Sequence, residues 1–274
     1  MNDTWRFLAV DLDGTVVDGA SGVSQATIEV FAALRARGLK LLVATGRSRR
    51  SALPWVEILA ARDGLICHNG AAVYDAAGKL LTQTVIPESE ARSLVELSRS
   101  LPYHFHGFVG DEWLFERIDA ETERYEKRSG FKGRKVDFDS IPDLGFNKAM
   151  FVATEEDVPA ISSRIRVALG DSVEIYPTGS GFVEVVAPGV SKGVSLDFLV
   201  QRLGGSMSEV IAFGDAGNDE DMLRKAGLGI AMGDASDELK ERIGRVTAKV
   251  SEDGVATWLT EFFKLENLSP ILVD

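Results

Sequence analysis

Short runs of apolar residues recur along the chain, and each one ends in glycine or polar residues. The first, Phe7–Val10, leads directly into Asp11. A short run without polar alternation is typical of a strand buried on both faces, as in a parallel sheet. Runs of the same kind stand at Leu39–Ala44, Gly64–Cys67, Val210–Phe213 and Leu228–Ala231.

Helical spacing of apolar residues separates the first two runs. Ser24 is a predicted N-cap and Gly38 a predicted helix stop. A strand, a helix and a second strand joined by short connections form a right-handed parallel unit. Further helices are predicted from Lys192 and from Val255 to Lys264, a hairpin over Ala72–Leu81, and a last short strand over Val246–Val250.

The pattern changes after about residue 84. Strands two or three at a time alternate with polar helices until about residue 188, which is typical of an α+β unit with an antiparallel sheet. We therefore expect an α/β protein with one domain built from residues 1–84 and 189–274, and a second domain inserted at residues 85–188. A charged helix from about Asp119 to Gly130 in this insertion is interpreted as a solvated outer face.

The composition narrows the function classes. The net charge of −12 and the pI near 4.8 make nucleic acid and acidic membrane surfaces poor partners. No apolar run approaches the roughly 20 residues that span a bilayer, and the first six residues lack a basic leader. The single cysteine, Cys67, is expected to be a buried strand thiol in a reducing, cytoplasmic compartment.

Four polar motifs stand at the carboxyl ends of predicted parallel strands, the third of them just before a helix: Asp11–Thr15, Thr45–Arg47, Ser191–Gly193 and Gly214–Asp219. Open α/β sheets bind ligands at the carboxyl ends of their strands. Unpaired buried carboxylates are costly, so two acids in Asp11-Leu12-Asp13 predict a bound cation.

With these motifs in place, the sequence resembles the haloacid dehalogenase superfamily, specifically its Cof-type (subclass IIB) phosphatases. The pair formed by Asp11-Leu12-Asp13-Gly14-Thr15 and the distant Gly214–Asp219 carries the resemblance, together with Asn69-Gly70-Ala71 and the large insertion. The resemblance implies a Rossmann-like parallel-sheet core with an inserted cap domain. It also implies Mg²⁺-dependent hydrolysis of phosphate monoesters through an aspartyl-phosphate.

The residue chemistry fits that reaction. A carboxylate can attack phosphorus and form an acyl phosphate, and Asp11 is the candidate nucleophile. Mg²⁺ is held in proteins by one or two carboxylates, which Asp11 and Asp215 would supply, with the backbone carbonyl of Asp13. The resemblance implies that the Asp13 side chain is the general acid and base.

The other motifs supply phosphate contacts. Thr45 is expected to hydrogen-bond a phosphoryl oxygen, with the backbone N–H groups of Gly46 and its neighbours. Lys192 would neutralise the phosphoryl oxygens and hold Asp11 close. Arg47 either contacts substrate or pairs with an acid on the surface.

The last acidic motif also supports the site. Asn218 is expected to hydrogen-bond phosphate or a metal-bound water, and Asp219 to orient Lys192 or those waters. Asp234 stands where asparagine is common in the family, which leaves open whether its loop supports the metal site in the usual way.

Two features of the insertion remain to be interpreted. His104 and His106 alternate in a predicted strand and are interpreted as structural, because a pair without a third ligand is not a metal site. The segment Pro177–Phe182, with Glu184, is expected to fold over the active site and contact the leaving group.

We therefore expect a cytoplasmic, Mg²⁺-dependent phosphatase of small phosphorylated metabolites, a monomer or homodimer without nucleic-acid or membrane partners. One alternative is a phosphomutase, which passes the phosphoryl group to a sugar. The other is a catalytically silent regulator that binds phosphorylated metabolites.

Overall fold

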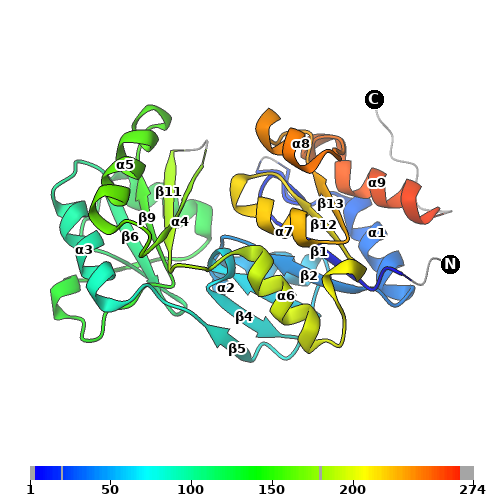
Figure 1. The fold of residues 1–274 in the computed structure, drawn as a ribbon, viewed down its shortest axis with the longest axis horizontal. Helices are drawn as coiled ribbons and strands as arrows, with labels where there is room; N and C mark the ends of the chain where they lie inside the picture. Colours follow the sequence, from blue (N-terminus) through cyan, green and yellow to red (C-terminus); the bar gives the residue numbers. More distant parts are fainter. Residues whose placement is uncertain (1–3, 20, 179–180, 266–274) are drawn as a thin grey trace. The chain divides into compact units, whose positions relative to one another are not determined.

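The computed structural model describes residues 4–19, 21–178 and 181–265 (Figure 1). The expectations for Met1–Asp3, and for Gly179 and Ser180 of the segment Pro177–Phe182, lie outside these residues. The chain forms two compact units. The first comprises Met1–Thr45, Ala52–Leu81 and Ser191–Asp274, and the second comprises Gly46–Ser51 and Thr82–Val190.

The first unit is built on a mixed sheet that has seven strands in the described part of the chain, in the order β13-β12-β1-β2-β3-β4-β5. β1 pairs in parallel with both β12 and β2, so it is an interior strand of the sheet. The strand bounds are β1 Phe7–Val10, β2 Lys40–Ala44, β3 Gly64–Cys67, β4 Ala72–Asp75, β5 Leu80–Gln83, β12 Val210–Gly214 and β13 Leu228–Ala231.

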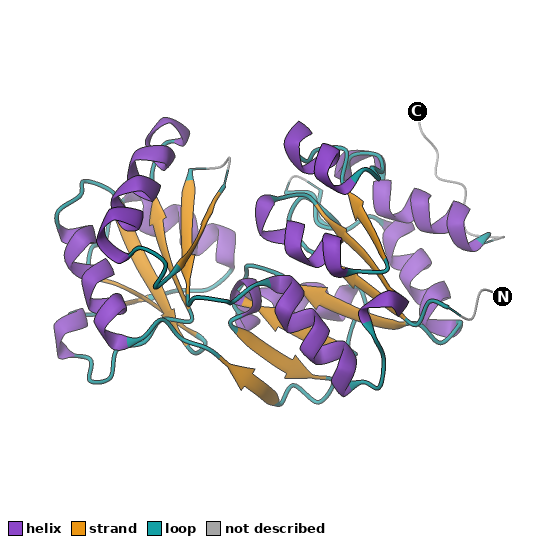
Figure 2. Ribbon diagram, in the orientation of Figure 1, coloured by secondary structure: helices purple, strands orange, loops and turns teal. Residues whose placement is uncertain are grey.

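Helices cover both faces of this sheet (Figures 1 and 2). Side chains alternate along β1: Leu8 and Val10 pack in one apolar cluster with α1, α2 and α9, and Phe7 and Ala9 pack in another with α6, α7 and α8. The helix bounds are α1 Gln25–Ala36, α2 Arg49–Ile58, α6 Lys192–Arg202, α7 Glu220–Lys225, α8 Asp237–Ile243 and α9 Gly254–Phe263. The result is a three-layer, Rossmann-like α/β core.

The second unit has a sheet of six strands within the described residues, in the order β10-β11-β9-β6-β7-β8 and antiparallel except for β7 with β8. α3 and α5 lie on one face of this sheet, and α4 packs against the other (Figure 1). The bounds are β6 His104–Val109, β7 Glu112–Phe115, β8 Arg134–Lys135, β9 Lys148–Val152, β10 Glu174–Pro177, β11 Phe182–Val186, α3 Glu88–Arg99, α4 Ala120–Ser129 and α5 Val158–Leu169.

Short 3₁₀ turns complete the described chain: η1 His68–Gly70, η2 Phe138–Ser140, η3 Glu155–Asp157, η4 Met207–Glu209, η5 Gly217–Asp219 and η6 Val250–Glu252. The strand expected over Val246–Val250 is wrong. Val246 makes one isolated bridge to Ala231, because the chain then turns: the N–H of Gly254 bonds to the carbonyl of Lys249.

α2 and α8 were missing from the sequence interpretation. α2 begins with consecutive arginines and contains Pro54, a residue that usually ends helices, so its periodicity is hard to see. α8 has only one buried residue, Leu239, and therefore shows no apolar stripe.

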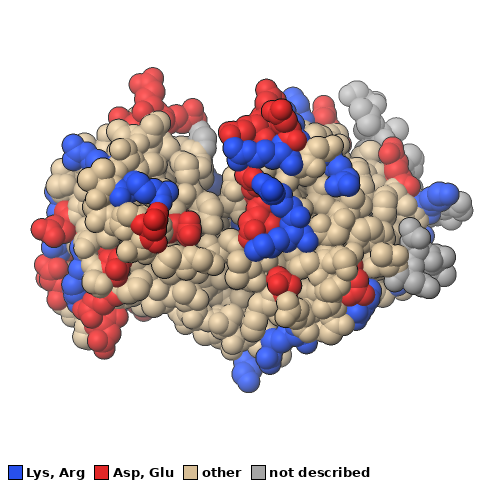
Figure 3. Space-filling view, viewed as in Figure 1, with Lys and Arg blue, Asp and Glu red and all other residues tan. Residues whose placement is uncertain are grey.

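The surface over α7 and α8 carries basic and acidic side chains side by side (Figure 3). Arg224 and Arg242 both pair with Glu220, at 3.3 and 2.8 Å, and Lys225 pairs with Asp221 at 3.0 Å. Exposed pairs of this kind contribute little to stability individually. Among the described residues, no helix combines the length and the apolar character needed to cross a membrane.

Candidate active site

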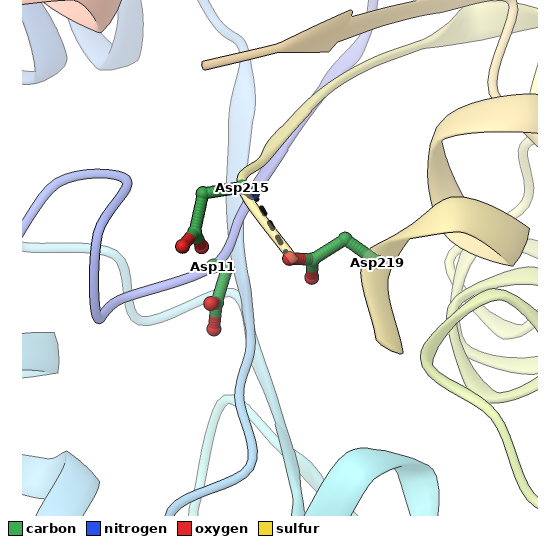
Figure 4. Close-up of side chains that lie close together, drawn as sticks. All are labelled: Asp11, Asp215 and Asp219. Carbon is green, nitrogen blue, oxygen red and sulfur yellow. Dashed lines mark hydrogen bonds between the residues drawn. The ribbon is translucent and has the colours of Figure 1, made fainter. Parts of the chain in front are cut away.

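Three carboxylates, one from the turn after β1 and two from the turn after β12, meet at one edge of the first sheet (Figure 4). Asp11 follows β1 and Asp215 follows β12, and the register pairs Val10 with Phe213 in these parallel neighbours. The residues after the two strands therefore leave the sheet side by side. Asp219 closes the turn after β12, and one oxygen from each of the three lies within 4.8 Å of the others.

A tight turn after β1 brings the backbone close to Asp215. Gly14 has a φ of +77°, and a Cβ added there would stand 2.7 Å from Cγ of Asp215. Only glycine fits this conformation without strain or a clash. The next residue, Thr15, donates a hydrogen bond from Oγ1 to Oδ1 of Asp215 at 3.3 Å.

Lys192 is the first residue of α6, where the hydroxyl of Ser191 caps the helix by accepting from the N–H of Val194 at 3.1 Å. Its side chain is fully buried. The ammonium lies 2.9 Å from Oδ1 of Asp11 and 2.6 Å from Oδ1 of Asp219. A buried cation that has two carboxylates at this distance is fixed in position, and it draws the carboxylate of Asp11 toward it.

Both oxygens of Asp219 are already used. Oδ1 accepts from Lys192, and Oδ2 accepts from the backbone N–H groups of Asp215 and Ala216, each at 3.0 Å. The side chain thus orients its neighbours and has less capacity left to bind a metal than Asp11 or Asp215 has.

The crowding of acids perturbs the pKa values. Burial raises the pKa of Asp11 well above its usual value; the charge of Lys192 opposes this, and the charges of Asp219, Asp215 and Asp13 add to it. Burial, and then the charge of Asp219, raise the pKa of Asp215 to about 7. Burial alone would lower the pKa of Lys192, but Asp11 and Asp219 outweigh it and raise that pKa. The site has more negative charge than its one ammonium can balance.

The second expected motif is divided between the two units. Thr45, 1% exposed, follows β2 in the first unit, and its carbonyl accepts from the N–H of Asn69 at 3.1 Å. Gly46 and Arg47 belong to the second unit, where Nη1 of Arg47 donates to Oγ of Ser51 at 3.4 Å. The structure thus places Thr45 at the sheet edge of the carboxylates, and the chain passes into the second unit at the next residue, Gly46.

Asn69 is a site residue for which the sequence interpretation gave no role. It is fully buried, has a left-handed φ of 59°, and accepts from Nδ2 of Asn218 at 3.0 Å. Oδ1 of Asn218 is buried without a hydrogen-bond partner in the described structure. The available signal was an Asn-Gly pair directly after a buried strand, which is typical of a special backbone turn.

Asp234 lies outside the carboxylate cluster. Its Oδ2 accepts from the N–H of Val250 at 2.9 Å, so it holds the loop after β13. His104 and His106 are buried in the second sheet, and Nδ1 of His104 lies 2.9 Å from Oδ1 of Asp119.

Cys67 is buried in β3, as expected. Glu184, expected at the leaving group, forms an ion pair with Lys148 on the neighbouring strand β9, and both side chains are largely buried. Its carboxylate is therefore held by a cation of its own unit.

The comparisons with known proteins agree with this geometry. Residues 8–259 match the haloacid dehalogenase-like hydrolase family. An HMP-PP phosphatase from Serratia proteamaculans (strain 568) is 30% identical over 263 residues, which cover 95% of this chain and 96% of that protein. A putative phosphatase from Haemophilus influenzae (strain ATCC 51907 / DSM 11121 / KW20 / Rd) is 32% identical over 271 residues, covering 97% of this chain and 100% of that one. A solved structure of a HAD subclass IIB sugar phosphatase superposes with a TM-score of 0.86 at 25% identity, covering 95% of this chain and 100% of that chain.

A largely parallel sheet with carboxylates clustered at the ends of its strands, and a buried lysine between two of them, defines a hydrolase of the haloacid dehalogenase class. The chain belongs to the haloacid dehalogenase-like hydrolase family, and within it this protein is a Cof-type phosphatase.

Proposed function

We propose that the protein is a Mg²⁺-dependent phosphatase that hydrolyses phosphate monoesters of small metabolites through an aspartyl-phosphate on Asp11. The observation that carries the proposal is the position of Lys192, which is buried and within 2.9 Å of Asp11. Two anions repel each other, so a carboxylate reaches a phosphate only where cations offset both charges.

The donor set fits a hard divalent cation. All candidate ligands are oxygens, which suits Mg²⁺. Burial first, and then neighbouring carboxylates, raise the pKa values of Asp11 and Asp215, and a bound cation would offset both effects. Asp11 and Asp215 would hold the ion, with the backbone carbonyl of Asp13. When bound, it would supply charge neutralisation for the phosphoryl oxygens and for the attacking carboxylate.

The proposed reaction has two steps. In the first, an oxygen of Asp11 forms a bond to phosphorus while the ester P–O bond breaks, and Asp13 donates a proton to the departing alkoxide. In the second, Asp13 takes a proton from water, whose oxygen attacks phosphorus. The acyl-phosphate bond then breaks, which releases phosphate and restores the carboxylate of Asp11.

The neighbouring side chains would position the phosphoryl group. Lys192 would neutralise its oxygens, and the hydroxyl of Thr45 and the N–H groups of the motif Thr45–Arg47 would donate hydrogen bonds to them. The unpartnered oxygen of Asn218 would accept from a water of the site. Asp219 would hold Lys192 and the turn after β12 in place.

We further propose that the second unit, corresponding to the expected insertion 85–188, is a cap that selects the leaving group. A cap excludes bulk water and limits the substrate to small molecules. The relatives named HMP-PP phosphatase and sugar phosphatase support a small phosphorylated metabolite as the substrate class.

The test is phosphate release from a panel of sugar phosphates, phosphorylated cofactors and nucleotides, with Mg²⁺ and with a chelator. We expect release from some members only with Mg²⁺, and none from the Asp11→Asn variant. Isomerised sugar phosphate without release of phosphate would identify a phosphomutase. Binding of a panel member without any turnover would identify a regulator.

A further inference from the structure

The position of Lys192 depends on where α6 begins, because Lys192 is the first residue of this helix. Its ammonium lies 2.9 Å from Asp11 and 2.6 Å from Asp219. Asp219 directly precedes α7, and α7 packs against α6 in the same unit (Figure 1). The contacts that hold these two helices together therefore determine whether the ammonium lies between its two carboxylates.

Asp221 on α7 forms such a contact. Its Oδ2 accepts a hydrogen bond from the hydroxyl of Ser191, the N-cap residue of α6. The same hydroxyl accepts from the N–H of Val194 at 3.1 Å. Because an ionised carboxylate only accepts, the one proton of the hydroxyl is donated to Asp221, and a lone pair remains for the helix cap. The carboxylate of one helix thus orients the capping group of the other.

The backbones of the two helices also approach each other closely at Gly193. A Cβ added there would stand 2.7 Å from the carbonyl carbon of Asp221, which is too close for a side chain. A further contact joins α6 to the turn η1, since Oγ of Ser195 donates to the carbonyl of Gly70 at 2.7 Å. The beginning of α6 is therefore fixed by α7 and by η1, all within the first unit.

Asp221 also has a partner on its own helix. The ammonium of Lys225 lies 3.0 Å from the same oxygen, Oδ2, and the side chain of Asp221 is 38% exposed. Exposed pairs four residues apart on a helix are common and contribute only about 0.3–0.5 kcal/mol, so this pair by itself indicates no role. The bond to Ser191 differs, because it joins residues 30 positions apart and reaches the residue before Lys192.

We propose that Asp221 is a positioning residue for the phosphatase reaction. Through the hydroxyl of Ser191 it fixes the first turn of α6, and it thereby holds the ammonium of Lys192 between Asp11 and Asp219. The carboxylate of Asp221 is bound to Ser191 and Lys225, so it acts through Ser191 and not on the substrate. The inference rests on the proposed function where it concerns turnover.

The first test is the rate of phosphate release by variants of Asp221. Asp221→Ala removes the acceptor of the Ser191 hydroxyl and should lower kcat by about ten- to a hundredfold, since a displacement of about 1 Å at a reacting site costs up to about a hundredfold. Asp221→Asn keeps an acceptor oxygen and should retain most of the activity. A merely structural role would lower the free energy of unfolding and leave kcat of the folded protein unchanged. An asparagine variant as slow as the alanine variant would contradict the role of the hydrogen bond.

A double-mutant cycle tests whether Asp221 acts through Ser191. Ser191→Ala removes the donor and also the helix cap, so it should lower kcat at least as much as Asp221→Ala does. If the two residues act as one unit, adding Asp221→Ala to Ser191→Ala should lower kcat no further. Losses that multiply in the double variant would overturn the inference.

Two variants are matched controls. Lys225→Ala removes the partner of Asp221 on its own helix, and Asp197→Ala removes a carboxylate of α6 that accepts from Gln201 at 2.8 Å. Both should leave kcat unchanged. A loss in Lys225→Ala equal to that in Asp221→Ala would assign the effect to the ion pair and contradict the inference.

A spectroscopic measurement separates this inference from the proposed function. In ¹⁵N NMR of the full chain with a chelator, the fully buried ammonium of Lys192 should give a slowly exchanging signal, which Lys192→Met identifies. The signal should shift or disappear in Asp221→Ala and persist in Asp221→Asn. This result would support the positioning role even if the protein releases no phosphate. A signal that Asp221→Ala leaves unchanged would overturn that role, and the phosphatase mechanism would stand if turnover is observed.

Discussion

Replacing Asp215 by asparagine is expected to make the metal-free protein more stable. Burial and the charge of Asp219 raise the pKa of Asp215 from 3.8 to about 7. Ionising this carboxyl therefore requires more free energy in the folded protein than in the unfolded chain. The difference between the two pKa values corresponds to about 4 kcal/mol at pH 8.

Asparagine keeps the shape of the side chain, and its amide oxygen can still accept from Thr15. We therefore expect Asp215→Asn to raise the free energy of unfolding by about 2–4 kcal/mol at pH 8 in the presence of a chelator.

The pH dependence provides a second readout. The folded-state pKa is raised, so between about pH 4 and pH 7 the folded protein binds more protons at Asp215 than the unfolded chain does. The contribution of this group to the free energy of unfolding therefore falls as the pH rises through that window and is constant above it. The variant should lack this slope, and its advantage over the wild-type protein should disappear near pH 4.

Urea denaturation with chelator at several pH values measures both effects. Addition of Mg²⁺ should stabilise the wild-type protein and not the variant, because only the wild-type protein retains the second carboxylate ligand. Asp171→Asn, at a fully exposed aspartate, is the control and should change neither quantity. Equal or lower stability of Asp215→Asn at pH 8 with chelator would refute the reasoning.

The remaining predictions concern the same cluster. Asp11→Asn should abolish phosphate release while thermal unfolding stays cooperative; a fully active variant would exclude Asp11 as the nucleophile. Lys192→Met should lower kcat by at least about a hundredfold, as does the loss of one electrostatic contact to a developing charge. Urea denaturation should show that the free energy of unfolding falls by about 3–5 kcal/mol, because Asp11 loses its buried partner. Gly14→Ala should destabilise the protein by about 1–3 kcal/mol in the same assay, because the new Cβ would clash with Asp215 and the residue has a positive φ. The variant should also bind Mg²⁺ more weakly in a calorimetric titration. Unchanged binding would contradict the close approach of the turn to Asp215.

Several parts of the fold were readable from local patterns. The buried strands of the first sheet stand out because a strand covered on both faces needs apolar residues at successive positions. Ser24 and Asp119 were predicted at helix starts, and each caps its helix by accepting from the N–H of Thr27 and Thr122. The family and the phosphatase class were predicted from short sequence motifs, and the comparisons confirm both.

Other parts depended on contacts that local patterns do not encode. Val246 extends the sheet by one bridge only, because the backbone beyond it turns back on itself. Arg124, Lys127 and Arg128 of α4 are exposed, as expected for a solvated face, but the charge pattern did not predict that Tyr125 packs against the sheet. Asn69 gained a role only when its partner Asn218 was placed beside it.

What the sequence alone determined is the chemistry at the ends of the strands. Acids and a threonine directly follow apolar runs that predict buried strands, and a lysine begins a predicted helix. This pattern already predicts a site. Only the tertiary structure decided the charge balance within that site. The parallel pairing of β1 with β12 brings Asp11 and Asp215 together, and the packing of α6 and α7 brings Lys192 to Asp219. Coulomb energies depend on distances in space and on burial, and neither quantity is contained in the spacing of residues along the chain.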